Sequence, residues 1–356
     1  MSAAAMLPAA RALKFGYANA RAKAMKSLLL ERPVLEQMID AGSVREVIGI
    51  LENTSYKQDL GEPSLKYSGA DLIELALGRH FARNARKALG FTPKDAVGTI
   101  MSVLEKWDAH NVKTILLGKH LAHPDDEIVP LLVPAGDLTP DMLKRMREQR
   151  DVESLVSFLA RTEYGEPLVQ LLDDYKKTRN VQPLLNAIEM TFYSVLSQRI
   201  SGTQPDEPAI LELVKADIDA KNIMSALRGK RDRAPEEEVM RYFIDGGNIS
   251  RREMKALAAC SSVEEAVDKV KARYDLGVAL ERYKADGSLV HFESGLERRI
   301  VEKGMSTLRI SILSPGAIVG YLYLKENEIG NIRKIVRGKE FGVPPEKLRE
   351  SVIFVG

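Results

Sequence analysis

The chain has 356 residues, enough for two or three domains at about 150 residues each. Its 52 Lys and Arg residues nearly balance 50 Asp and Glu residues, and aromatic residues make up 6%. Proteins whose main task is to grip nucleic acid carry a clear basic excess, so the composition argues against that class. The single cysteine, Cys260, excludes an internal disulfide framework and a cysteine-based zinc site.

The first thirty residues contain five basic residues and no acidic residue. Such a segment imitates a mitochondrial presequence. We favour instead an amphipathic helix of the mature protein, with Leu13, Tyr17, Met25 and Leu28 on one side.

Helix signals recur along the rest of the chain, and strand signals are almost absent. Ser43 with Glu46, and Ser262 with Glu265, each match a capping box, in which the two side chains satisfy unpaired amides at a helix start. Asp151 stands in the corresponding place without the Glu. We therefore expect an all-α fold. No run of roughly 20 apolar residues occurs, so no transmembrane helix is expected.

One pattern occurs three times: an acidic residue, two positions, Asn, an aliphatic residue, and a Gly-Lys pair that closes the segment. The Asn residues are 111 and 109 positions apart, so the chain is predicted to use one unit three times. The copies are Asp108, Asn111, Gly118 and Lys119; Asp219, Asn222, Gly229 and Lys230; and Glu328, Asn331, Gly338 and Lys339.

Each copy of the pattern is predicted to be a buried helix. Apolar residues follow the Asn at +1, +4 and +5, which places them in one stripe. The Gly stands where a left-handed C-terminal residue is expected, and the Lys beside the negative end of the helix. The Asn borders the stripe, so we expect its amide to bond a neighbouring backbone group or the acid one turn earlier.

Two interpretations of the pattern stay open. It can serve only to hold each helical bundle together, or its acids and the Arg residues before Gly, Arg228 and Arg337, can also face a partner. The first copy has Leu117 in place of that Arg, which argues against a fully symmetric role.

The spacing predicts a division of the chain into four parts. They are an N-terminal helix (1–32) and helical repeats at 33–135, 136–246 and 247–356. Candidate joints are rich in Pro and Gly and lie at His123–Gly136, Gly202–Pro208 and Asp245–Asn248.

No catalytic constellation is recognisable. The Gly-Lys pairs lack the spacing of a phosphate-binding loop and end a helix, whereas a phosphate loop precedes one. His120 and His123 precede three acids, but no helical metal-binding frame exists, and a solvated loop is the favoured interpretation. Cys260, in an apolar helical run, and Trp107, directly before the first repeated acid, are both predicted to be buried. We expect no catalytic residue, no cofactor and no metal.

Five segments together resemble a known family, the C subunit of the archaeal-type rotary ATPases, which is called the d subunit in vacuolar enzymes. The resemblance extends over essentially the whole chain, and its last segment is the most specific. The matching residues are Phe15, Gly16, Tyr17, Asn19, Ala20 and Arg21; Leu51, Thr54 and Tyr56; Val133, Pro134 and Gly136; Asp219, Asn222, Leu227, Arg228 and Lys230; and Lys325, Glu326, Glu328, Asn331, Ile332 and Arg333.

This resemblance implies three pseudo-threefold-related helical bundles that close into a funnel with a central cavity. It also implies a non-catalytic part of the central stalk on the cytoplasmic face of the membrane, which couples ATP turnover to proton or sodium transport. The partners would be the rotor shaft subunits of D and F type and the membrane proteolipid ring, with no nucleic acid.

The same resemblance implies structural or interface residues in all three copies of the pattern. They are Asp108, Asn111, Asp219, Asn222, Arg228, Glu326, Glu328, Asn331 and Arg333. The alternative from composition alone is a helical-repeat scaffold that binds RNA or another protein, because basic residues gather near the N-terminus and at 228–233.

Overall fold

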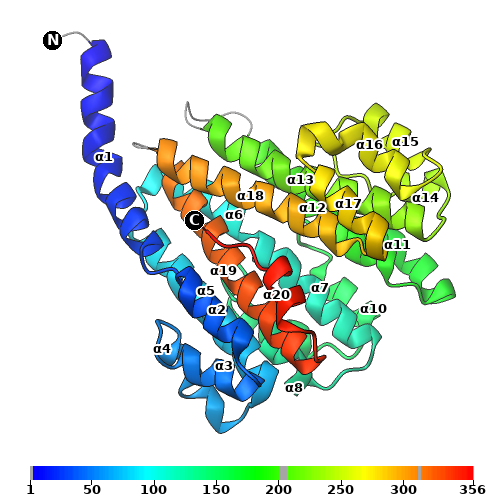
Figure 1. Ribbon diagram of the computed structural model, residues 1–356, viewed down its shortest axis with the longest axis horizontal. Coiled ribbons are helices and arrows are strands. Elements are labelled where there is room, and N and C mark those ends of the chain that lie inside the picture. The colour runs from blue at the N-terminus through cyan, green and yellow to red at the C-terminus, as the bar shows by residue number, and fades with distance from the viewer. Residues whose placement is uncertain (1–2, 201–206, 312–313, 356) are drawn as a thin grey trace.

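The computed structural model describes residues 3–200, 207–311 and 314–355, and every regular element in these ranges is a helix (Figure 1). The all-α prediction is therefore confirmed for them. The joint predicted at Gly202–Pro208 lies, apart from its last two residues, outside the described residues. None of the helices in these ranges combines the length and the apolar character needed to cross a bilayer.

The helices follow one another with short connections. The first part of the chain forms α1 (Ala3–Lys26), α2 (Arg32–Asp40), α3 (Val44–Leu51), α4 (Lys57–Leu60), the 3-10 helix η1 (Pro63–Leu65), α5 (Gly69–Phe91), η2 (Lys94–Ala96) and α6 (Val97–Leu104). The middle part forms α7 (Lys106–His120), α8 (Asp125–Ile128), η3 (Val129–Leu131), α9 (Pro140–Arg147), α10 (Val152–Leu159), α11 (Gly165–Thr178) and α12 (Gln182–Ile200). The last part forms α13 (Glu207–Arg231), α14 (Glu236–Met240), α15 (Arg251–Ala258), α16 (Val263–Tyr274), α17 (Gly277–Asp286), α18 (Val290–Ile310), α19 (Gly316–Glu340) and α20 (Pro345–Ser351).

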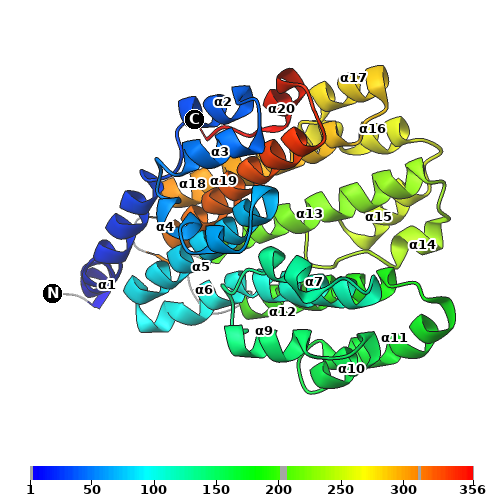
Figure 2. The same ribbon diagram turned by 90° about the horizontal axis from the view of Figure 1, so that it is seen from below.

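The three copies of the repeated pattern lie on α7, α13 and α19, which we call the motif helices. Each is followed by a short helix, α8, α14 or α20. Figures 1 and 2 place α20, from the end of the chain, beside α2, from its beginning, and the two helices are in contact.

Helix α1 packs on α19 and α5, and its buried face differs from the predicted one. Tyr17 and Leu28 are 66% and 67% exposed, so their placement on the apolar side was wrong. Phe15, Ala18 and Ala22 are buried in their stead, with Met25 as predicted. The side chain of Leu13 lies outside the described residues. Small Ala side chains let α1 lie close against its neighbours, which a search for large apolar residues overlooks.

The predicted N-caps are present, but the Glu side chains accept from a different residue than predicted. Ser43 and Ser262 accept the N–H of Glu46 and Glu265. The Glu carboxylates accept one residue earlier than a capping box requires, from Gly42 and Ser261. Asp151 forms a full capping box with Ser154, whose hydroxyl replaces the missing Glu. Local cap chemistry thus fixes where these helices begin.

Among the described residues, the buried apolar side chains form two clusters, and α13 contributes to both. Its first half, with Leu213 and Ile218, joins the larger cluster, and its second half, with Ile223 and Leu227, packs under α14–α17. Trp107 and Cys260 are buried, as predicted. The polar side of α13 faces a cleft.

Candidate functional site

The Asn of each motif helix is fully buried and makes the same two hydrogen bonds. Its Nδ2 donates to a backbone carbonyl 22 residues later, and its Oδ1 accepts the N–H of that same residue. The partners of Asn111, Asn222 and Asn331 are Val133, Ile244 and Ile353, at 2.8 to 2.9 Å. The prediction of a backbone partner is confirmed. Each Asn therefore satisfies the backbone N–H and C=O of one residue in a non-helical segment, and without it these two polar groups would have no such partner.

The acid of each motif helix is also buried and accepts backbone N–H groups. Asp108 accepts from Asp137 at 2.7 Å and from Leu138 at 3.1 Å. Asp219 accepts from Asn248 and Ile249, and also from the Tyr274 hydroxyl at 2.9 Å.

Glu328 in the third motif helix finds its partners at the beginning of the chain. Its carboxylate accepts the N–H of Leu30 and, at 2.6 Å, the Tyr56 hydroxyl. It also pairs with Lys325, which is almost fully buried. The third acid therefore ties residues 30–56 to α19.

The Gly of each pattern has a different role from the predicted one. Each lies inside its helix, and the left-handed residues come four positions later, at Ala122, Arg233 and Gly342. The C-cap prediction was therefore wrong. A Cβ on Gly118, Gly229 or Gly338 would overlap the Ile128, Val239 or Leu348 side chain of the following short helix. Glycine is needed for close packing of that helix.

The Lys of each pattern donates to a backbone carbonyl at the end of a helix. Lys119 reaches Arg147, Lys230 reaches Ala258, and Lys339 reaches Ile39. An ammonium group near the negative end of a helix dipole is favourable. The contact of Lys339 again joins the two ends of the chain.

A second set of equivalent residues lies five positions before each Asn, and these three meet. The ammonium of Lys106 on α7 is 3.1 Å from Asp217 on α13 and 3.1 Å from Glu326 on α19. The Tyr193 hydroxyl donates to Asp217 at 2.9 Å. The three motif helices are thus joined by one ion triad.

Burial and charge act against each other in the triad. Burial would lower the pKa of Lys106, but Asp217 and Glu326 hold this pKa well above its usual value. Burial raises the pKa of Glu326, although Lys106 opposes this effect. For Asp217, burial is outweighed by Lys106 and Lys221, so its pKa is lowered. The ammonium therefore keeps its charge, which stabilises two acids that would otherwise repel each other.

The remaining predicted residues occupy the surface of the same helices. Arg333 is 2.8 Å from the buried Glu74, and Arg228 is 3.2 Å from Glu293 on α18. The Arg228 and Glu293 side chains are about half exposed, at 52% and 45%. Arg228 is therefore accessible to a partner, whereas Arg333 is mainly occupied within the fold.

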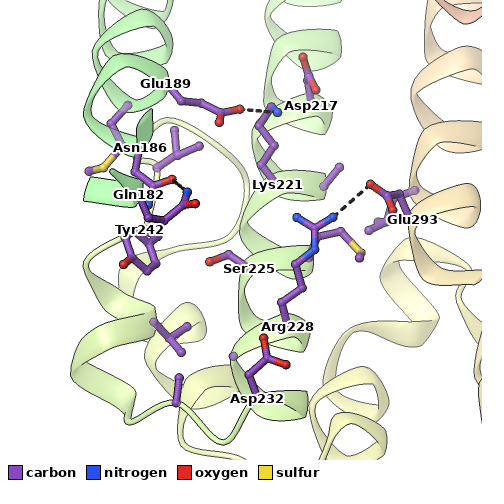
Figure 3. A pocket seen from close by; sticks show the side chains of 18 of the residues that line it. Gln182, Asn186, Glu189, Asp217, Lys221, Ser225, Arg228, Asp232, Tyr242 and Glu293 are labelled. Carbon is purple, nitrogen blue, oxygen red and sulfur yellow. Dashed lines mark hydrogen bonds and ion pairs between the residues drawn. The ribbon is translucent and has the colours of Figure 1, made fainter. Parts of the chain in front are cut away.

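A cleft of about 550 Å³ opens over α13, between α12 and α18 (Figure 3). The polar side chains of its floor recur every three or four residues, so they share one face of α13. They are Asp217, Lys221, Ser225 and Arg228 on α13, and Asp232 directly after its end. Ion pairs cross the cleft from this floor to both walls: Lys221 to Glu189 on α12, and Arg228 to Glu293 on α18.

The cleft wall carries a strongly perturbed acid. Burial alone would raise the pKa of Glu189, but Lys221 and Lys113 outweigh it and lower the pKa to about 2. Lys113 lies on α7, 3.1 Å away. Glu189 on α12 therefore lies between Lys113 on the first motif helix and Lys221 on the second. Its two ion pairs connect both motif helices to α12.

The residues considered for other chemistry are engaged in ordinary contacts. His120 lies 3.0 Å from the Tyr175 hydroxyl, and His123 lies 2.5 Å from Glu127. Among the described residues, no group of three or more His, Cys, Asp or Glu side chains is placed to hold a metal ion.

Several residues of this site were not predicted from the sequence. Lys106 and Asp217 stand at the same offset from Asn as Glu326, so a comparison of the three copies could have found them. Tyr56 and Tyr274 could not be assigned to an acid, because they lie 272 and 55 positions away from it.

Comparison with known proteins places nearly the whole chain in one family. Residues 18–351 match the model of the ATP synthase (C/AC39) subunit family. The C subunit of the A-type ATP synthase of Thermoplasma acidophilum is 30% identical, over 94% of this chain and 96% of the relative. Its counterparts in Haloferax volcanii and Methanocaldococcus jannaschii are 30% and 27% identical, over 95% of this chain in each case, and over 97% and 86% of the relatives. The match confirms the resemblance found in the motifs, and the chain belongs to the ATP synthase (C/AC39) subunit family.

Proposed function

We propose that this chain is the non-catalytic central-stalk component of an A/V-type ATP synthase. In this role it is a socket that links the rotor shaft to the membrane rotor ring, on the cytoplasmic face. It thereby couples ATP turnover to proton or sodium transport. Its partners are the shaft subunits of D and F type and the proteolipid ring.

The observation that carries this proposal, beside the family, is the ion triad of Lys106, Asp217 and Glu326. Equivalent positions of three repeated helices can meet only if the helices converge. Convergence of this kind is expected if three related bundles close around a common centre. Three bundles joined in this way would form a stiff part, which a component that transmits torque requires.

Within this proposal, the cleft over α13 is a contact site for the shaft. Arg228 on the floor of the cleft and Glu293 on its wall are charged groups that are about half exposed and can meet a partner. Their ion pair is weak because water screens both charges. A partner can therefore replace it without a large cost.

The test is co-purification of the full-length chain with the D- and F-type shaft subunits, and separately with the detergent-solubilised ring. The proposal predicts a stable complex with each. Absence of both complexes, with the chain folded by circular dichroism, would overturn it. Steeply salt-dependent binding of RNA by the isolated chain would instead favour the alternative scaffold function, because counterion release dominates such contacts.

The role of the cleft is tested by charge reversal. Arg228→Glu should weaken the shaft complex roughly tenfold, and the double variant with Glu293→Arg should restore the internal ion pair but not shaft binding. Arg273→Glu is the matched control, because Arg273 pairs with Glu253 at similar exposure away from the cleft. Equal weakening by the control would show that the cleft is not the contact site.

A further inference from the structure

The side of each motif helix that carries a triad residue reaches a second set of equivalent positions further along the helix. Eleven residues make about three turns of an α-helix and advance about 16 Å, so residues eleven apart share one side. Each triad residue has a counterpart eleven positions later on the same uninterrupted helix. These counterparts, which we call the outer positions, are Leu117, Arg228 and Arg337.

Exposure to solvent rises from the triad to the outer positions. The triad side chains are 10% to 30% exposed. At the outer positions, Leu117 is 38% exposed, and the Arg228 and Arg337 side chains are 52% and 39% exposed. The same side of the three helices is therefore packed together at the triad and open to solvent three turns later.

The outer side of α7 is apolar. Leu117 occupies the position that is Arg in the other two copies. Leu121 lies one turn further on the same side and is 54% exposed. Single exposed apolar residues are common on protein surfaces. Two leucines together, at a place where both equivalent helices carry a charge, instead indicate a local apolar surface.

The outer sides of the other two motif helices differ from α7 and from each other. Arg228 on α13 is followed four residues later by Asp232, so this side carries only charged groups. Arg337 on α19 is followed four residues later by Phe341, which is 81% exposed, so this side combines a charge with an aromatic ring. Equivalent backbone positions thus carry three different kinds of surface.

We propose that the outer positions bind the shaft in one rotational orientation. An apolar side of a shaft helix lies against Leu117 and Leu121, and acidic groups of the shaft lie towards Arg228 and Arg337. The single orientation rests on the proposed function, because it concerns the shaft. Three helices with equivalent backbones would by themselves accept a partner in three orientations, and the unequal side chains exclude two of them.

Desolvation and charge give the physical reason. In either of the other orientations, acidic groups of the shaft would face the two leucines. A charged group that loses its water against an apolar surface, without a partner, is strongly destabilised. Contacts that penalise the wrong arrangement in this way create specificity even where the right arrangement gains little.

Arg337 is available to the shaft in the same way as Arg228. Its guanidinium lies 2.9 Å from Glu340, and both side chains of this pair are at least one third exposed, so the pair contributes little. It also lies 3.7 Å from the buried Glu74, but Arg333 holds that acid at 2.8 Å. Arg337 can therefore turn towards a partner without leaving a buried charge unpaired.

Shaft binding by the full-length chain tests the apolar contact. Leu117→Arg gives the first copy the residue that the other two copies carry, and it places a charge against the apolar side of the shaft. We expect the affinity for the purified D- and F-type shaft subunits to fall roughly tenfold, with an unchanged thermal midpoint. An unchanged or raised affinity would overturn the proposed orientation.

Val278→Arg is the matched control. Val278 is 69% exposed and lies on α17, which is not a motif helix. The control adds the same charge and should leave the shaft affinity within about twofold of the wild type. An equal loss in the control would show that any added charge weakens the complex, which would also contradict the proposed orientation.

Cysteine cross-linking measures the orientation directly. Leu117→Cys, Arg228→Cys and Arg337→Cys place a thiol at each outer position in turn, while the native Cys260 is buried. A shaft with one introduced cysteine should link to one of these variants at least about fivefold more than to the other two. Equal yields with all three variants, at a saturating shaft concentration, would overturn the single orientation.

The two proposals fail in different ways. A wild-type chain that forms no complex with the shaft would overturn the proposed function, and the single orientation with it. A stable complex that tolerates Leu117→Arg, or that cross-links equally at the three outer positions, would overturn the single orientation alone.

Discussion

The first and third motif helices share the same Asn and Lys contacts but differ in how their acids are held. Asp108 on α7 is buried against two amides of the stretch that directly follows, whereas Glu328 on α19 has an ammonium, a hydroxyl and an amide. The environment of Asp108 is the poorer one, because burial raises its pKa to about 7 in spite of the two amide donors. Asp108 bonds a segment that follows α7 along the chain and has two amide donors there. Glu328 bonds residues from the beginning of the chain and has a charged partner, Lys325, in addition.

The largest expected effect concerns the pH dependence of Asp108. Its pKa is about 7 in the folded protein, above the ordinary value of 3.8. Between these values the folded state keeps a proton that the unfolded state has lost. Stability therefore falls as pH rises from about 4 to 7, by up to about 4 kcal/mol at about 1.4 kcal/mol per pKa unit. In Asp108→Asn this contribution should vanish.

Urea unfolding of the wild type and of Asp108→Asn at several pH values measures this difference. Contributions from the other titrating groups cancel when the two curves are subtracted. A difference that does not change between pH 4 and pH 7 would show that Asp108 is ionised throughout.

A second comparison removes the buried amides. Asn111→Ala and Asn331→Ala each leave a backbone N–H and C=O without a partner, which should cost about 3 kcal/mol. Urea unfolding should show one transition for Asn111→Ala. Asn331→Ala should likewise show one transition with a similar loss, because Asn331 makes the same two bonds with Ile353. Clearly unequal losses would show that the equivalent bonds do not stabilise the two regions to the same extent.

The ion triad should behave differently from both regions, because it belongs to all three motif helices. Lys106→Met leaves two acids facing each other and should cost about 2 kcal/mol, reduced by the 30% exposure of the lysine side chain. Additional Asp217→Leu and Glu326→Leu changes should recover most of this loss in thermal unfolding. If the thermal stability is not recovered, the buried Tyr193 hydroxyl, which donates to Asp217, requires that carboxylate as its hydrogen-bond partner.

Close packing of the short helices predicts a smaller effect. Gly338→Ala and Gly118→Ala should each destabilise by about 1 to 2 kcal/mol, because the added methyl group meets Leu348 or Ile128. Gly330, also in α19, has open space around it, and Gly330→Ala should stabilise by about 0.5 to 1 kcal/mol. Thermal midpoints of the three variants give the comparison, and a stabilising Gly338→Ala would contradict it.

The smallest effect is expected at Arg228. Its ion pair with Glu293 is half exposed, so Arg228→Ala should change stability by less than about 0.5 kcal/mol. An unchanged thermal midpoint combined with weakened shaft binding would indicate a contact residue. A clearly lowered midpoint would assign Arg228 to the packing of α13 against α18.

Much of the site could be predicted from the sequence, because the three copies report on one another. The apolar stripe after each Asn was predicted and is buried in all three copies. The predicted backbone partner is confirmed for Asn111, Asn222 and Asn331. The division into units at 33–135, 136–246 and 247–356 stays a prediction, and the contacts of Leu30 and Ile39 favour assigning residues 30–60 to the third motif helix.

The sequence by itself determined that the chain is helical and where α3, α10 and α16 begin, since caps and apolar spacing act between residues a few positions apart. Only the tertiary structure decided which glycine lies under which side chain, that Lys106 meets Asp217 and Glu326, and that Glu328 takes its partners from the start of the chain. These contacts depend on how separate helices pack, and packing distance is independent of distance along the sequence.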